Sequence, residues 1–241
     1  MRMPRFSLAR TLSPYALIPA LLFLLLSTNL LAAPTVEVIA LRGSGEVIAN
    51  GKTTALAVGL QLEQGAEIRT HSPGRCKLRF PDDSVVIVSD ASQLRLETLT
   101  EEPAASSAPS AFVDELFTQP RMTLTRVQLM LERGLIGQTV TDDPNRPWEV
   151  KGRSAVTAVR GTQFEVEVTD DLTYDVHITQ GSVAVTATTA AEGPTTAPKP
   201  STYILDKPGL GISCRLDLGC NTPKPWGEER MSKMFKRLEG V

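Results

Sequence analysis

The stretch 158–168, AVRGTQFEVEV, places a basic residue, a glycine and a threonine directly before a strictly alternating segment. Phe164 and the two valines that follow it are separated by glutamates, and this period of two predicts a β-strand with one face in the core. A glycine suits the corner before such a strand, because it accepts backbone angles that other residues avoid. Arg160-Gly161-Thr162 is therefore either the corner of a fold or a charged recognition point.

The residues around this corner favour a structural role. A strand follows Gly161, whereas a phosphate cradle needs the start of a helix. The hydroxyl of Thr162 can hydrogen-bond within the turn. Arg160 can pair with an acid such as Glu165 or Asp175. A role for Arg160 in binding a partner stays open as the alternative.

The same alternation extends along most of the chain and predicts an all-β fold. Segment 174–178, YDVHI, repeats it with Asp175 and His177 on the outward side, and 169–172 joins the two strands as a hairpin. Gly181 turns the chain into the next strand. Asn50-Gly51 is a strong hairpin signal nearer the N-terminus. We expect a solenoid-like stack of short strands and hairpins.

Composition divides the chain into two β halves with distinct connecting segments. Residues 35–99 and 121–186 carry the alternating strands. Residues 100–120 are rich in Ala, Ser and Pro and predict an insertion, and 187–201 is a Thr/Pro-rich spacer. Residues 202–241 predict a last strand pair and a helix.

The C-terminal segment is typical of an amphipathic helix. Apolar residues recur at i, i+3, i+4 and i+7 from Met231 to Leu238. Acids open the segment and bases close it, which suits the helix dipole. Trp226, Met231 and Phe235 are candidate partner-binding residues. The alternative is that the helix packs on its own domain.

Residues 1–33 have the pattern of a secretory signal peptide. Three arginines and no acid precede an apolar run that ends in small residues. A retained membrane anchor is the alternative, because the run is long for a signal. Either outcome exports the remaining chain, so we expect a periplasmic protein whose only membrane contact is through this segment.

The three cysteines predict one disulfide and one buried thiol. Cys214 and Cys220 lie in CRLDLGC, where an oxidising compartment favours a short-range bridge, with two free thiols as the alternative. Cys76 alternates with Leu78 and Phe80 on what we predict to be an inward strand face. Zinc is disfavoured, because no CxxC pair accompanies the two histidines.

The remaining residues disfavour nucleic-acid binding and catalysis. The formal net charge is -2, which is unsuited to neutralising phosphates, and no basic stripe occurs. His71 and His177 stand in no motif with a nucleophile, and His177 is expected on the surface. The pairs Asp82-Asp83, Asp142-Asp143 and Asp170-Asp171 suit turns better than a catalytic dyad or a loose Ca²⁺ contact. We therefore expect no enzyme, metal or cofactor.

Two quoted stretches carry a family resemblance. LAVGLQLEQGAEIRTHSPGRCKLRFPDDSVVIVSDASQLRLE resembles the first half of a FecR domain, with Asp83 and Ala66 departing from the usual residues. VQLMLERGLIGQTV, followed by WEVKGRSAVTAVRGTQFEVEV and YDVHITQGSVAV, is similar to the second half. The similarity covers most of 36–186. In register with the family pattern are Val159, Gly161, Thr162, Phe164, Val166, Gly181 and Val183.

The resemblance implies an all-β, solenoid-like fold and a regulatory role. The best-known members are inner-membrane regulators whose periplasmic FecR domain senses a TonB-dependent outer-membrane transporter, while a cytoplasmic N-terminal domain binds a sigma factor. Here only a short basic stretch precedes the apolar run, which implies an exported, stand-alone domain. We expect a non-enzymatic interaction module in envelope signalling or organisation, bound to an envelope protein. The alternative is a peptidoglycan- or glycan-binding accessory protein that presents Trp148 and Tyr174 to sugars.

Overall fold

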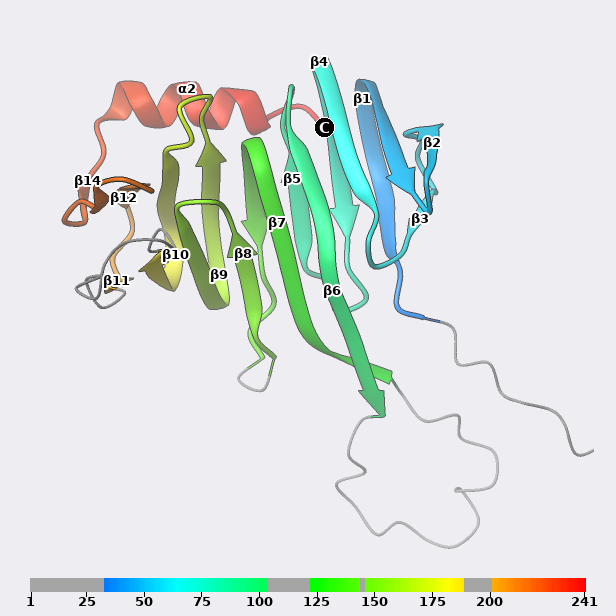
Figure 1. The fold of residues 1–241 in the computed structure, drawn as a ribbon, viewed down its shortest axis with the longest axis horizontal. Helices are drawn as coiled ribbons and strands as arrows, with labels where there is room; N and C mark the ends of the chain where they lie inside the picture. Colours follow the sequence, from blue (N-terminus) through cyan, green and yellow to red (C-terminus); the bar gives the residue numbers. More distant parts are fainter. Residues whose placement is uncertain (1–32, 104–121, 144–145, 189–200) are drawn as a thin grey trace, which may run out of the picture. The chain divides into compact units, whose positions relative to one another are not determined.

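A computed structural model describes residues 33–103, 122–143, 146–188 and 201–241 (Figure 1). The predicted signal segment, most of the predicted insertion and most of the spacer lie outside these residues. Among them, no helix has the length and hydropathy of a membrane span. In chain order the elements are β1 (Val36–Ala49), β2 (Lys52–Ala55), β3 (Gln61–Leu62), β4 (Glu67–Arg79), β5 (Val85–Val88), β6 (Gln93–Pro103), β7 (Met122–Thr139), β8 (Trp148–Lys151), β9 (Ala155–Val168), β10 (Tyr174–Ala187), β11 (Thr202–Leu205), β12 (Leu210–Arg215), β13 (Gly219–Cys220), β14 (Lys224–Pro225) and α2 (Glu228–Leu238).

The strands form one hydrogen-bonded sheet, which confirms the all-β prediction. The order along its main path is β13-β12-β10-β9-β8-β7-β5-β4-β1-β2. All pairings are antiparallel except β7 with β8. A solenoid-like coil is not confirmed, because antiparallel neighbours and hairpins build the sheet. β6 continues through Pro103 and so overlaps the start of the predicted insertion.

The long strands bend and continue into a second layer. In β9, residues 156–159 pair with β8, whereas residues 163–168 pair with β7. β10 follows the same bend, because its residues 174–177 pair with β12 and its residues 183–186 with β11. Each bent strand therefore contributes to both layers.

Two layers face each other across the core. The helix-side layer contains β5, β12 and the parts of β7, β9 and β10 that pair with them. The far layer contains β8, β11 and the remaining parts of β7, β9 and β10. The indole of Trp148 in the far layer donates a hydrogen bond to Gln138 Oε1 at 2.9 Å. The hydroxyl of Tyr174 in the helix-side layer donates to Val150 O at 2.8 Å. Both aromatic rings are fully buried.

Glycines with positive φ form the corner that the opening stretch predicted. Gly161 has φ +53° and Gly181, opposite it, has φ +91°. A Cβ at Gly161 would lie 2.7 Å from Asp142 Cβ, and one at Gly181 would lie 2.8 Å from the Gly161 carbonyl. The corner thus requires glycine both for its backbone angles and for its space.

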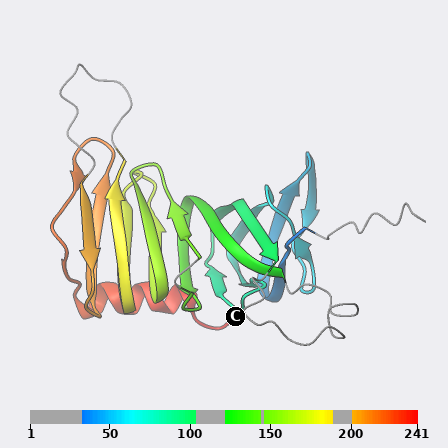
Figure 2. The ribbon, with the colours of Figure 1, turned by 90° about the horizontal axis from the view of Figure 1, so that it is seen from below.

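The predicted hairpins and the C-terminal helix are present. Asn50 and Gly51 both have positive φ, as a two-residue hairpin loop of type I′ requires, and they join β1 to β2. β9 and β10 are joined after Val168, which pairs with Tyr174. In Figures 1 and 2, α2 runs across the direction of these strands, on one side of the sheet.

Candidate interaction site

Helix α2 covers a polar face of the helix-side layer. Glu165, Glu167, Asp175 and His177 point away from the core, as their place in the alternation predicts. The prediction that His177 lies on the surface is wrong, because α2 packs over it: Glu165 is 4% and His177 3% exposed. Alternation reports which side of a strand a residue faces, but not whether another element covers that side.

Glu165 and His177 form a buried pair under the helix. Nδ1 of His177 lies 2.8 Å from Oε2 of Glu165. The hydroxyl of Thr179 lies 3.2 Å from each carboxylate oxygen. Trp226 stacks on the imidazole at a centroid distance of 5.5 Å, and Phe235 meets it edge-on at 6.0 Å. Nε2 of His177 is buried and makes no hydrogen bond to any described residue.

Asp175 and Arg230 form a second link between sheet and helix. Nη2 of Arg230 lies 2.6 Å from Asp175 Oδ2, and Ser213 donates to the other carboxylate oxygen. The guanidinium also lies 3.4 Å above the Trp226 ring, which is cation–π geometry. Burial raises the pKa of Asp175, and the hydrogen bond from Ser213 and the charge of Arg230 oppose that rise in part.

The C-terminal half of α2 adds one more ionic contact and a small apolar cluster. Arg237 donates to Glu167 and lies 3.6 Å from Asp90. Met234 and Leu238 are buried against Leu135 of β7. Leu238 can approach the sheet because Gly137 has no side chain there: a Cβ on Gly137 would lie 2.8 Å from Leu238 Cδ1.

The candidate partner-binding residues in and just before α2 therefore pack against the protein's own sheet. Trp226, Met231 and Phe235 are half-buried, so only their exposed parts are open to a partner. The sequence did not lead us to predict that Arg230 and Arg237 of α2 form ion pairs with acidic residues of the sheet. Arg230 and Arg237 are seven residues apart, which places them on one helical face, and that spacing was the available signal.

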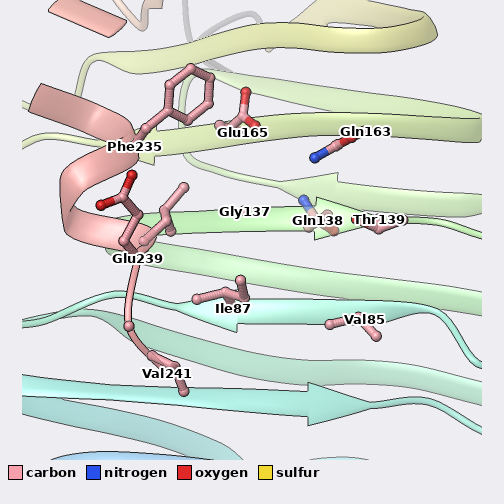
Figure 3. Close-up of a pocket in the computed structure, with 12 residues that line it drawn as sticks. Val85, Ile87, Gly137, Gln138, Thr139, Gln163, Glu165, Phe235, Glu239 and Val241 are labelled. Atoms are coloured by element: carbon pink, nitrogen blue, oxygen red, sulfur yellow. The ribbon is translucent and has the colours of Figure 1, made fainter. Parts of the chain in front are cut away.

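A groove of about 470 Å³ lies beside the C-terminal end of α2. Figure 3 shows Phe235 next to Glu165 on one side and Ile87 and Val85 of β5 on the other. The floor is largely aliphatic, with polar groups at its margin. The lining residues are Val85, Ile87, Gly137, Gln138, Thr139, Gln163, Glu165, Phe235, Leu238, Glu239, Gly240 and Val241.

The Arg160 corner lies on the far layer, away from this groove. The hydroxyl of Thr162 is 2.7 Å from the Arg160 carbonyl and 2.9 Å from that of Ser182, so it fastens the corner as predicted. Phe164 is fully buried. The suggested pairing of Arg160 with Glu165 or Asp175 is wrong, since both acids lie on the helix-side layer and bind His177 and Arg230. Arg160 is exposed and its guanidinium contacts no acid among the described residues.

The cysteines follow the sequence prediction. Cys214 and Cys220 are joined by a disulfide between β12 and β13, so the bridge is confirmed. Cys76 is a free, fully buried thiol, and burial raises its pKa to about 12. A thiol held protonated in this way is unsuited to nucleophilic chemistry.

One member of each aspartate pair considered for other chemistry has a structural partner: Asp82 and Asp143 lie beside Arg146, and Asp171 accepts a hydrogen bond from Thr169. Asp82 forms a buried ion pair with Arg146 at 2.7 Å. Within the described ranges, no group of three or more His, Cys, Asp or Glu is arranged to hold a metal ion. The idea that Trp148 and Tyr174 present a sugar-binding platform is wrong, because both rings are fully buried in the core.

Comparison with known proteins finds a family match for the central part of the chain. The family model described as FecR protein matches residues 66–184. Two solved structures from Parabacteroides distasonis ATCC 8503, described as a "putative anti-sigma factor", are similar at 20% identity and a TM-score of 0.46. Each match covers 69% of this chain and 62% of the solved one, so this chain spans less than two thirds of that length. No curated protein matches.

Proposed function

This chain is a FecR-domain protein, and from that premise we propose that it is a non-enzymatic protein-interaction module in envelope signalling. The family match carries the proposal. The matched residues 66–184 include β4 to β9, most of β10 and the apolar floor of the groove. A regulatory role agrees with a site built from packing surfaces and ion pairs.

We propose that the groove beside α2 receives a segment of an envelope protein. Val85, Ile87 and Gly137 give it an apolar floor, and Thr139 and Gln163 are exposed polar groups at its margin. Binding sites commonly combine an apolar floor with a few polar groups that fix orientation. The partner segment would offer one apolar side chain to the floor and backbone or amide groups to the margin.

We further propose that the protein works in the periplasm. Supporting this are the basic and apolar pattern of residues 1–33 and the Cys214–Cys220 disulfide, since such bridges persist in oxidising compartments. Protease protection in intact cells and in cells with a permeabilised outer membrane tests the location. Digestion should occur only after permeabilisation.

The groove is tested by filling it. Thr139→Trp places a large ring at the margin of the groove from an exposed position, so it leaves the core intact. Thr53→Trp, at an exposed position of β2, is the matched control. Affinity capture from envelope fractions should recover the same partner with the wild type and Thr53→Trp and lose it with Thr139→Trp. Equal recovery by both variants would argue against the groove.

A further inference from the structure

Arg160 is the one charged outward side chain among the described residues of the far layer over β9, β10 and β11. Over β4 and β6, which continue the sheet beyond β7, the charges are paired, with Arg69 bound to Glu67 and Arg95 to Glu132. An uncovered sheet face and a sheet edge usually carry such charges, because they prevent association. The outward residues of the uncharged part are Val156, Ala158, Ser182, Ala184, Thr186, Thr202 and Ile204.

A hollow and a protruding side chain lie next to each other on this face. Ala158 pairs across the strands with Ala184, which pairs in turn with Ile204 of the edge strand β11. The two alanines belong to the lining of a hollow of about 340 Å³. Ile204 stands beside it with 57% of its surface exposed. The face thus carries both an apolar knob and a space that fits one.

Arg160 and Glu149 line the hollow, where Glu149 accepts a hydrogen bond from Gln128, and a second anion, Asp206, lies at the edge strand. Arg160 pairs in register with Ser182, on the row next to the two alanines. Asp206 directly follows β11, beside that same row. Both side chains are exposed, and neither makes an ion pair or hydrogen bond to another described side chain. Opposite charges on one face, two strands apart, make the face complementary to itself.

We propose that this face binds the same face of a second copy of the chain. Ile204 of each copy enters the alanine-lined hollow of the other, and Arg160 of each meets Asp206 of the other. A two-fold axis along β10 makes both contacts together, because Ile204 lies two strands from Ala158 and Asp206 lies two strands from Arg160. A two-fold interface needs such self-complementarity.

The interface is small, so the dimer forms and dissociates with concentration. Few strands contribute to it, and small interfaces are typical of transient association. Ile204 is its central apolar contact, and loss of a central contact weakens association by about tenfold or more. The proposal concerns the purified chain alone and is independent of any envelope partner.

Sedimentation velocity over a wide concentration range tests the dimer. The full chain, purified after export in the form that the cells produce, should shift from monomer to dimer as concentration rises. Ile204→Asp should remain monomeric, whereas Val58→Asp should behave as the wild type, because Val58 is 62% exposed outside this face. Circular dichroism and thermal melting confirm that each variant is folded.

A charge swap tests the Arg160–Asp206 contact. Arg160→Asp and Asp206→Arg should each weaken the dimer, because each places like charges together. The double variant should restore it, because the two charges are exchanged. A wild type that stays monomeric at the highest concentration, a dimer indifferent to Ile204→Asp, or a double variant as weak as the single ones would overturn the proposal.

Discussion

Removal of Arg230 should loosen α2 from the sheet by leaving Asp175 buried without its counter-charge. The Arg230 side chain is 43% exposed, whereas that of Asp175 is 8% exposed. Breaking a fully buried pair costs about 3–5 kcal/mol. The exposure of Arg230 and the retained hydrogen bond from Ser213 reduce this loss. We therefore expect Arg230→Ala to lower the free energy of unfolding by about 2 kcal/mol. For a domain of this size, that lowers Tm by about 4–8 °C.

The neutral partner variant gives the contrast. Asp175→Asn removes a charge that burial already disfavours, so it should cost less than Arg230→Ala. Because the folded-state pKa of Asp175 is raised above 3.8, its charged form opposes folding. The stability that it contributes is present below the unfolded pKa and is lost as pH rises through the folded pKa. The defect of Arg230→Ala should therefore shrink as pH falls toward the carboxylate range.

The chain's two tryptophans report on this prediction separately. Trp226 lies between His177 and Arg230 and senses undocking of α2, whereas Trp148 lies in the core. Urea unfolding is followed by fluorescence in two variants that each keep one tryptophan, the other being replaced by Phe. At neutral and at acidic pH, these variants report the undocking of α2 and the unfolding of the core separately. An Arg230→Ala protein with a wild-type midpoint, or Asp175→Asn as costly as Arg230→Ala, would refute the reasoning.

Three further predictions concern the corner and the cysteines. Gly161→Val should lower the free energy of unfolding by about 2 kcal/mol or more, because φ is +53° and a Cβ meets Asp142. Arg160→Ala should change that free energy by no more than about 0.5 kcal/mol, and the urea midpoints of the two variants compare the effects. The double variant Cys214→Ala, Cys220→Ala should lower the free energy of unfolding by roughly 2 kcal/mol. Peptide mapping without reduction that finds both thiols free would contradict the disulfide. Cys76 should resist a thiol reagent in the native protein and react on unfolding; rapid native labelling would contradict its burial.

Much of the fold could be predicted because the local signals agree with one another. The alternation of Phe164, Val166 and Val168 specified a core-facing strand, and Asn50-Gly51 specified its turn by backbone angles. The amphipathic period of α2 likewise predicted its buried residues. Each of these signals lies within a few residues of what it determines.

The site was harder to predict, because it joins segments far apart in sequence. Glu165 and His177 looked like surface residues, since a strand's outward side is usually solvated in antiparallel sheets. Only the docking of α2, more than 40 residues later, covers them. The glycan-binding alternative placed Trp148 and Tyr174 on the surface, but both are buried, because each ring carries one polar group that can be hydrogen-bonded inside the core. The acceptors of these hydrogen bonds, Gln138 and Val150, come from the facing layer.

The proposed partner site is tested most directly by photo-crosslinking in living cells. A photoreactive residue at Gln163, which is exposed and lines the groove, should form one discrete adduct with an envelope protein. The same residue at Thr53 of β2 should not form it, and Thr139→Trp should abolish the adduct from Gln163. No adduct from Gln163, or the same adduct from both positions, would contradict an interaction site beside α2.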